Sequence, residues 1–190
     1  MHETPIMKMT VLSGILTFLV LFTHEIILPL ELLLFGEGFH LSILVYLPMG
    51  YWVIVAYYER WAAAMYLAPG MAFGLMLYGN PEAGLISHAG SLLVMAFTAP
   101  MVFAFLAWSA GRANEPIFEP LAWRLIVGGG VLTAVINSLG LHVVRHRVFP
   151  DAVSMPSILA YLTSGILGLF ACLAVLSIAF RIRNRVVHLD

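Results

Sequence analysis

Apolar segments long enough to cross a lipid bilayer recur throughout this chain, and they constrain its fold more than any other feature. A hydrocarbon core about 30 Å thick is crossed by about 20 helical residues. Hydropathy places six candidate spans at about residues 10–35, 41–58, 62–78, 83–109, 121–144 and 156–181. A helix bonds its backbone groups within one segment, as lipid surroundings require. We therefore predict an all-α, polytopic integral membrane bundle of about six transmembrane helices.

Composition supports a membrane protein and excludes a strongly charged one. Of 190 residues, 62% are hydrophobic and 10% are charged, and soluble domains are markedly less apolar. Ten acidic and nine basic residues give a net charge of −1, which provides no basic field for nucleic acid. The single cysteine, Cys172, excludes an internal disulfide. We expect one transmembrane domain over residues 1–190, surrounded by membrane lipid.

The basic residues between the spans predict an orientation. Seven fall on one side of the predicted bundle: Lys8, Arg60, Arg112, Arg124, Arg181, Arg183 and Arg185. Arg145 and Arg147 fall on the other side. Because cytoplasmic loops are enriched in Lys and Arg, this distribution favours cytoplasmic termini in a bacterial inner membrane.

Ionisable residues interrupt the first span, which contains His24, Glu25 and Glu31. A charged group at mid-membrane costs roughly 2.5–3.5 kcal/mol, so it normally has a partner or a function. Thr10, Thr17, His24 and Glu31 recur every seven residues, which places them on one helix face.

Two interpretations of this stripe stay open, a buried polar network that fixes helix packing and a ligand or proton site. Glu25 lies on a neighbouring face and needs another partner. On the span 121–144, the polar residues Asn137 and His142 are the best candidates for neighbours. The candidate ligand or proton site therefore consists of His24, Glu25, Glu31, Asn137 and His142.

The remaining motifs give no positive indication of a metal, a cofactor or catalysis. His40, His88 and His142 lie near one side of the predicted bundle. His142 and His146 are four residues apart, the spacing of paired metal ligands, but Arg145 and Arg147 flank His146 and their charge repels a cation. No hydrolase triad, nucleotide-binding loop or paired-cysteine motif occurs. We expect a non-enzymatic protein without a bound metal or cofactor.

Small residues predict close helix contacts. Gly70 and Gly74 form a GxxxG pattern, and Gly130 and Gly140 share a face of the span 121–144. Such faces pack helices together within one chain or against a partner, and the sequence leaves both open.

The segment 47–61 resembles a signature of bacterial membrane-associated sensor domains of the first MASE class. Pro48-Met49-Gly50 begins a short apolar helix, which ends in a turn with Arg60 and Trp61. The segments 137–140 and 161–168 are similar to that family's later helices. Its members normally precede a histidine kinase or a cyclic-dinucleotide enzyme. Since residues 1–190 contain no such output domain, the resemblance implies a sensory or interaction module that acts through a separate partner protein.

Two alternatives remain. A six-helix chain with both ends inside is also similar to the substrate-capture subunits of energy-coupling factor transporters, which bind a small solute from outside. On that interpretation Glu25, Glu31, His88 and Asn137 line an outward-facing vestibule. The third alternative is an accessory subunit of a larger membrane complex, with the Gly70/Gly74 face as its docking surface.

Overall fold

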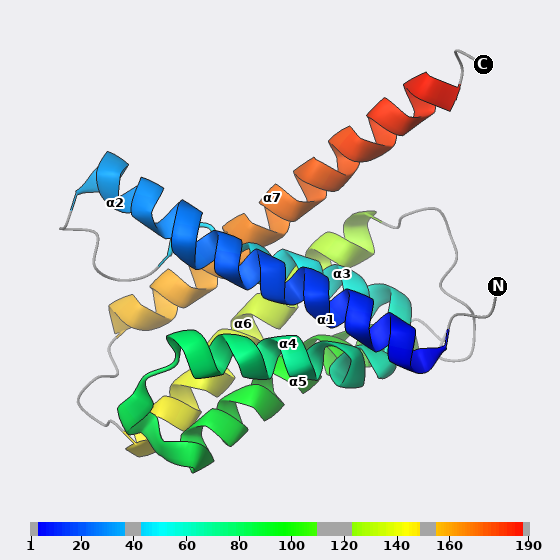
Figure 1. The fold of residues 1–190 in the computed structure, drawn as a ribbon. Coiled ribbons are helices and arrows are strands. Elements are labelled where there is room, and N and C mark those ends of the chain that lie inside the picture. Colours follow the sequence, from blue (N-terminus) through cyan, green and yellow to red (C-terminus); the bar gives the residue numbers. More distant parts are fainter. Residues whose placement is uncertain (1–3, 37–42, 110–122, 149–154, 188–190) are drawn as a thin grey trace.

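The computed structural model describes residues 4–36, 43–109, 123–148 and 155–187, and within these ranges the regular elements are all helical. The elements are α1 (Pro5–Phe22), the π turn η1 (Thr23–Ile27), α2 (Leu28–Phe35), α3 (Leu47–Glu59), α4 (Ala62–Tyr78), the 3₁₀ turn η2 (Pro81–Ala83), α5 (Gly84–Ser109), α6 (Trp123–Val148) and α7 (Met155–Val187). The all-α prediction is confirmed for this part of the chain. Figure 1 shows α1 beginning and α7 ending on the same side of the bundle.

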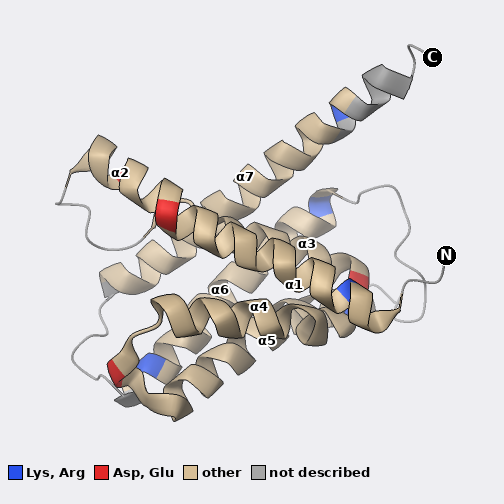
Figure 2. Cartoon of the chain, viewed as in Figure 1, with Lys and Arg blue, Asp and Glu red and all other residues tan. Residues whose placement is uncertain are grey.

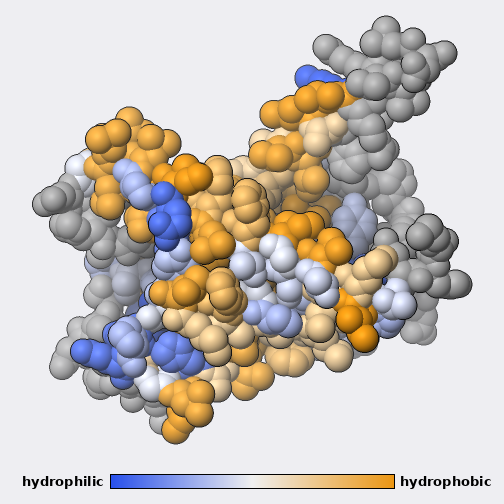
Figure 3. All heavy atoms as spheres, in the orientation of Figure 1, coloured by the Kyte–Doolittle hydropathy of each residue, from blue (hydrophilic) through white to orange (hydrophobic). Residues whose placement is uncertain are grey.

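Among the described residues, four helical segments are long and apolar enough to cross a membrane: Pro5–Phe35, Pro81–Ser109, Trp123–His146 and Pro156–Ala179. A fifth, Ala62–Tyr78, is apolar but shorter. Their outward faces carry large apolar side chains such as Leu33, Leu85 and Ile86, which are 81%, 85% and 89% exposed. Figure 3 shows such apolar side chains over much of one face. An apolar surface of this extent suits lipid better than water, which supports the prediction of transmembrane helices.

The first helix is continuous from Pro5 to Phe35 but contains a π turn at Thr23–Ile27. In this turn the backbone amide of Leu28 donates to the carbonyl of Thr23, five residues earlier. Pro29 follows directly, has no amide hydrogen and crowds the carbonyl of Glu25. The proline accounts for the local widening, and π turns inside α-helices occur frequently at functional sites.

The second predicted span, 41–58, was too long: α3 begins at Leu47 and contains 13 residues. The described residues before it, Ile43–Tyr46, are not helical. Their amides have other partners, because Leu44 and Val45 donate to the Glu31 carboxylate and Tyr46 donates to the carbonyl of Ser164. Pro48 at the start of α3 also favours a helix beginning there.

Although it is short, α3 is the centre of the bundle. It contacts α1, α4, α5, α6 and α7, and Val53 is fully buried. Two glycines let α7 approach it closely. A Cβ on Gly50 would lie 2.6 Å from the carbonyl oxygen of Gly168, and one on Gly168 would overlap the carbonyl of Tyr46.

The other predicted spans differ from the helices mainly at their ends. The span 62–78 matches α4, and α5 begins at Gly84, after the turn at Pro81–Ala83. α6 continues to Val148, beyond the predicted end at 144, and α7 continues to Val187, beyond 181. The last part of α7 projects away from the bundle (Figure 1). Figure 2 shows most charged residues near helix ends, with an acidic residue inside the first helix and long uncharged stretches elsewhere.

The four glycines predicted at helix contacts all face other helices of this chain. A Cβ on Gly70 would lie 2.8 Å from the carbonyl oxygen of Ser13 on α1, and one on Gly74 would lie 3.2 Å from Val20. The corresponding contacts of Gly130 are Leu169 and Val53, and that of Gly140 is Val94. The Gly70/Gly74 face is therefore occupied by α1 rather than left open for a partner.

Candidate functional site

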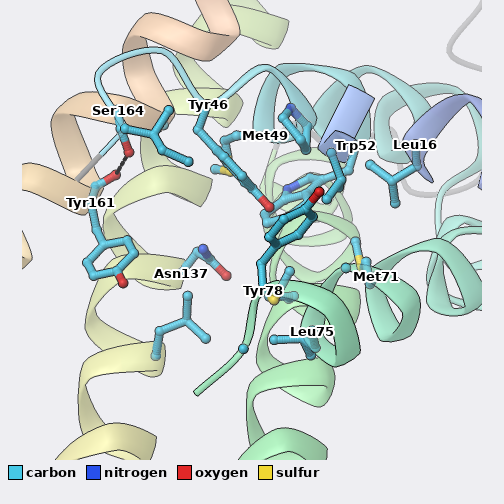
Figure 4. A pocket seen from close by; sticks show the side chains of 18 of the residues that line it. Leu16, Tyr46, Met49, Trp52, Met71, Leu75, Tyr78, Asn137, Tyr161 and Ser164 are labelled. Carbon is cyan, nitrogen blue, oxygen red and sulfur yellow. Dashed lines mark hydrogen bonds between the residues drawn. The ribbon is translucent and has the colours of Figure 1, made fainter. Parts of the chain in front are cut away.

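A cavity of about 260 Å³ lies at the centre of the bundle. Its wall comes from α1, η1, the segment before α3, and α3 to α7, and it is mostly apolar, with Leu16, Val20, Met49, Met71 and Met95 among its members. Figure 4 shows side chains from these elements converging on the cavity. A cavity lined by residues of every major helix is the arrangement expected of a ligand site within a helical bundle.

A second, more polar cavity of about 400 Å³ adjoins the first. Its wall includes Ser87, His88, Ser91, Ser138 and His142. Six residues line both cavities: Leu75, Tyr78, Gly79, Leu141, Arg145 and Tyr161. The two spaces are therefore neighbours, and we call the larger, more polar one the vestibule and the central one the inner chamber, with the shared residues at their boundary.

Tyr78 at this boundary is held by the π turn of the first helix. Its ring stacks on His24 with centroids 3.8 Å apart and an angle of 5° between the planes. Its hydroxyl donates to Oε1 of Glu25 at 2.7 Å. The π turn thus presents two consecutive ionisable residues to one tyrosine, and Tyr78 connects the first helix to the boundary between the cavities.

Arg145 lies opposite in the same boundary and is exposed. Its guanidinium donates to the hydroxyl of Tyr161 and lies 4.7 Å from the centroid of that ring. Within the described residues, no carboxylate forms an ion pair with Arg145. A guanidinium has five N–H donors, so this contact leaves most of its hydrogen-bonding capacity available.

Two buried polar groups of the inner chamber have no hydrogen-bond partner among the residues that the structure describes. They are Oδ1 of Asn137, whose residue is 8% exposed, and the indole N–H of Trp52, whose residue is 2% exposed. Figure 4 shows the Asn137 amide projecting into the chamber. Because a buried polar group without a partner costs about 1–3 kcal/mol, these two groups stand out among the residues that line the chamber.

The structure divides the five predicted site residues into three groups. His24 and Asn137 line the inner chamber, and His142 lines the vestibule. Glu25 reaches the site through Tyr78 rather than through Asn137 or a histidine. Glu31 is not among the residues that line either cavity.

Glu31 binds the backbone in front of α3. Its two carboxylate oxygens accept from the amides of Leu44 and Val45 at 2.8 and 3.0 Å. Non-helical backbone at membrane depth needs such partners. This geometry gives Glu31 a role in holding the chain that leads into the central helix.

The predicted polar stripe holds only in part. Thr10 is exposed and donates to the carbonyl of Ile6 on its own helix. The π turn changes the helical phase between Thr17 and Glu31, so the regular spacing of seven no longer keeps one face. As for metals, the described ranges contain no group of three or more His, Cys, Asp or Glu side chains that could hold an ion.

Sequence reasoning missed Tyr78, Trp52 and Tyr161 as site residues, and it used Arg145 to predict orientation and to argue against a metal site. Tyr78 and Arg145 lie near helix ends, where aromatic and basic residues usually indicate the membrane interface. One signal could have found Tyr78: it directly precedes the turn Gly79-Asn80-Pro81, on the side predicted to contain the histidines.

Comparisons with known proteins give no match for this chain, whether to a family model, a curated protein or a solved structure. The site geometry is therefore the basis for a functional proposal.

Proposed function

We propose that this chain is a non-catalytic membrane module that receives a small solute in its central cavity and acts through a separate partner protein. The observation that carries the proposal is Tyr78. It lines both cavities and is bound by His24 and Glu25 of the π turn. A solute that moves from the vestibule into the chamber passes Tyr78, so its arrival changes the contacts of the first helix.

The proposal includes a topology of six segments with both termini in the cytoplasm of a bacterial inner membrane. Four described helices have membrane-spanning length, α4 is a shorter apolar helix, and α3 is surrounded by the others. Arg145 and the vestibule lie at the end of the bundle where α6 finishes, away from the start of α1 (Figure 1). In this topology the vestibule opens outward and the Lys8 end contacts the partner.

The test is a solute screen on the purified protein in lipid nanodiscs. We expect a solute of the correct class to raise the melting temperature by several degrees, because binding to the folded state adds stability. Hydrogen exchange should slow at Thr23–Ile27 as Tyr78 and the π turn become fixed. If no solute in a panel of organic acids, vitamins and divalent metals changes the melting temperature, the proposal is wrong.

A cavity-filling variant provides the matched control. Ala134 is 3% exposed and lines the inner chamber, so Ala134→Phe should abolish the solute response. Ile136, two positions along the same helix, is 44% exposed and lines neither cavity. Ile136→Phe should therefore retain the full response, and an equal loss in both variants would contradict binding in the chamber.

A solute-capture subunit of the energy-coupling factor type is the second candidate, and the central chamber beside a polar vestibule favours it. The two functions differ in the fate of the bound solute. A capture subunit delivers its solute to the cytoplasmic side, whereas a sensory module returns it to the outside. Uptake of a labelled solute into cells that contain this chain together with its co-purified partner separates them. The accessory-subunit alternative loses its main support because α1 covers Gly70 and Gly74.

A further inference from the structure

We infer the class of molecule that this site takes: an elongated amphipathic organic anion, with its anionic group at Arg145 and a hydroxyl-type polar group at Asn137. The inference rests on the proposed binding function and names its ligand. Three observations carry it, namely the position of Arg145, the unpartnered amide oxygen of Asn137 and the apolar wall between them.

Arg145 provides the anion contact. Its cationic group lies at the boundary of the two cavities and has no carboxylate partner in the described residues. Tyr161 fixes it in place by a hydrogen bond and by its ring face. A positioned guanidinium binds carboxylate or phosphate with paired, charge-assisted hydrogen bonds. The same group would give no advantage to a neutral solute.

Asn137 provides the second polar contact. Its amide is buried and projects into the chamber, and its oxygen has no partner in the described part of the chain (Figure 4). The indole N–H of Trp52, which lines the same chamber, is in the same situation. A hydroxyl can donate to the amide oxygen and can also accept a hydrogen bond. It therefore suits these groups better than a methyl terminus does.

The space between the two contacts determines the length and the character of the molecule. Asn137 and Arg145 are eight residues apart on α6, which corresponds to about 12 Å along the helix axis. The chamber holds about 260 Å³, more than the roughly 150 Å³ cavity that accommodates benzene. Because leucine, methionine and valine side chains line it, the body of the ligand should be an apolar chain or ring system of that length.

Three probes separate the contributions: ω-hydroxydecanoate has both polar ends, decanoate has the anion alone, and decanol has a hydroxyl without an anion. Their affinities are measured by isothermal titration calorimetry on the protein in phosphatidylcholine nanodiscs, with empty nanodiscs subtracted to remove membrane partitioning. We expect ω-hydroxydecanoate to bind about tenfold more tightly than decanol. Decanoate should be intermediate.

Single substitutions test whether Arg145 causes the preference for an anion and Asn137 the preference for a hydroxyl. Arg145→Gln should remove the preference for anions, whereas Arg124→Gln is the matched control, because Arg124 is an exposed arginine at the opposite end of the same helix. Asn137→Leu should remove the roughly fivefold advantage of the hydroxyl and widen the preference of decanoate over decanol, because decanol also loses its hydroxyl contact. Loss of folding would not produce this selective pattern.

The anion can come from a free solute or from a lipid headgroup. Repeating the titration with phosphatidylglycerol in the nanodiscs distinguishes them, because a competing lipid lowers the apparent affinity of the probe and a free-solute site is unaffected. The inference is overturned if decanol binds as tightly as decanoate, or if Arg145→Gln leaves the preference unchanged. The inference is also overturned if only solutes of another class shift the melting temperature of the protein. In each of these three cases the proposed function, solute binding in the central cavity, still stands. If neither these probes nor the solute panel binds, both fail.

Discussion

In the half of the bundle where α1 begins, Lys8 and Ser13 have polar partners on neighbouring helices. Lys8 forms an ion pair with Glu59 at 3.0 Å, and the Ser13 hydroxyl donates to the carbonyl of Tyr66 and accepts from the amide of Gly70. In the half of the bundle where α6 finishes, Asn137 lacks a described partner for its oxygen and Arg145 has no described carboxylate. We call these the paired end and the open end.

This difference indicates that the paired end stabilises the fold and that the open end binds the ligand. The paired end closes its hydrogen bonds even where a proline disturbs a helix, since the Ser13 hydroxyl bridges Tyr66 and Gly70 directly beside Pro69 of α4. At the open end, Asn137 and Arg145 line a cavity instead. Substitutions at the paired end should therefore reduce stability, whereas those at the open end should change binding.

The largest expected effect is at Gly70. A Cβ there would lie 2.8 Å from backbone and 3.3 Å from Leu16, so Gly70→Ala should lower the free energy of unfolding by about 3 kcal/mol through overpacking. SDS titration of the purified protein measures this. Gly14, on the neighbouring helix α1, has nothing within 4 Å of its Cβ position. Gly14→Ala should therefore preserve or raise stability, and equal losses in both variants would refute the contact.

Ser13→Ala should have the next largest effect. It removes both hydrogen bonds that connect α1 to α4 and should cost about 2 kcal/mol by the same measurement. Ser13→Thr retains the hydroxyl and should recover part of the loss. A cost near zero for Ser13→Ala would show that the α1–α4 contact does not depend on this bridge.

Asn137→Leu should change stability in the opposite direction. It replaces a buried amide that has an unpartnered oxygen with an apolar side chain of similar size, which should raise the free energy of unfolding by about 1 kcal/mol. Removal of the hydroxyl preference described above should accompany the gain. A clear loss of stability would mean that Asn137 has a structural partner, and the contrast between the two ends would fail.

The smallest effect is expected at Lys8. The ion pair with Glu59 is partly exposed, and such pairs contribute about 0–1 kcal/mol. Lys8→Gln should therefore reduce the melting temperature slightly, and the difference from wild type should shrink as salt is added. A difference that is independent of salt would exclude the charge as its cause.

The sequence was sufficient to predict the helices, because apolar length and turn residues act locally. It predicted α4 to the residue and the ends of the others to within several positions. The start of α3 could not be predicted, since it depends on Glu31 and Ser164, which are distant in sequence from Leu44–Tyr46.

The candidate site was predicted less completely for the same reason. His24, Asn137 and His142 were found as polar residues in apolar segments, and they line the cavities. Tyr78 and Arg145 matter through their positions between two spaces, and a one-dimensional pattern contains no information about such a boundary. The π turn likewise depends on how Pro29 is accommodated in three dimensions.

The π turn also sets the rotation of α2 relative to α1. It contains one residue more than the α-helix would place over the same height, so its conversion to α-helix would turn one end of the first helix against the other by about 100°. Lys8 and Ser13 fix the near end to α3 and α4. The far end would have to turn, taking Glu31 away from Leu44 and Val45. A change in the contacts of Tyr78 with the π turn would then be coupled, through rotation of the first helix, to release of the backbone that leads into α3.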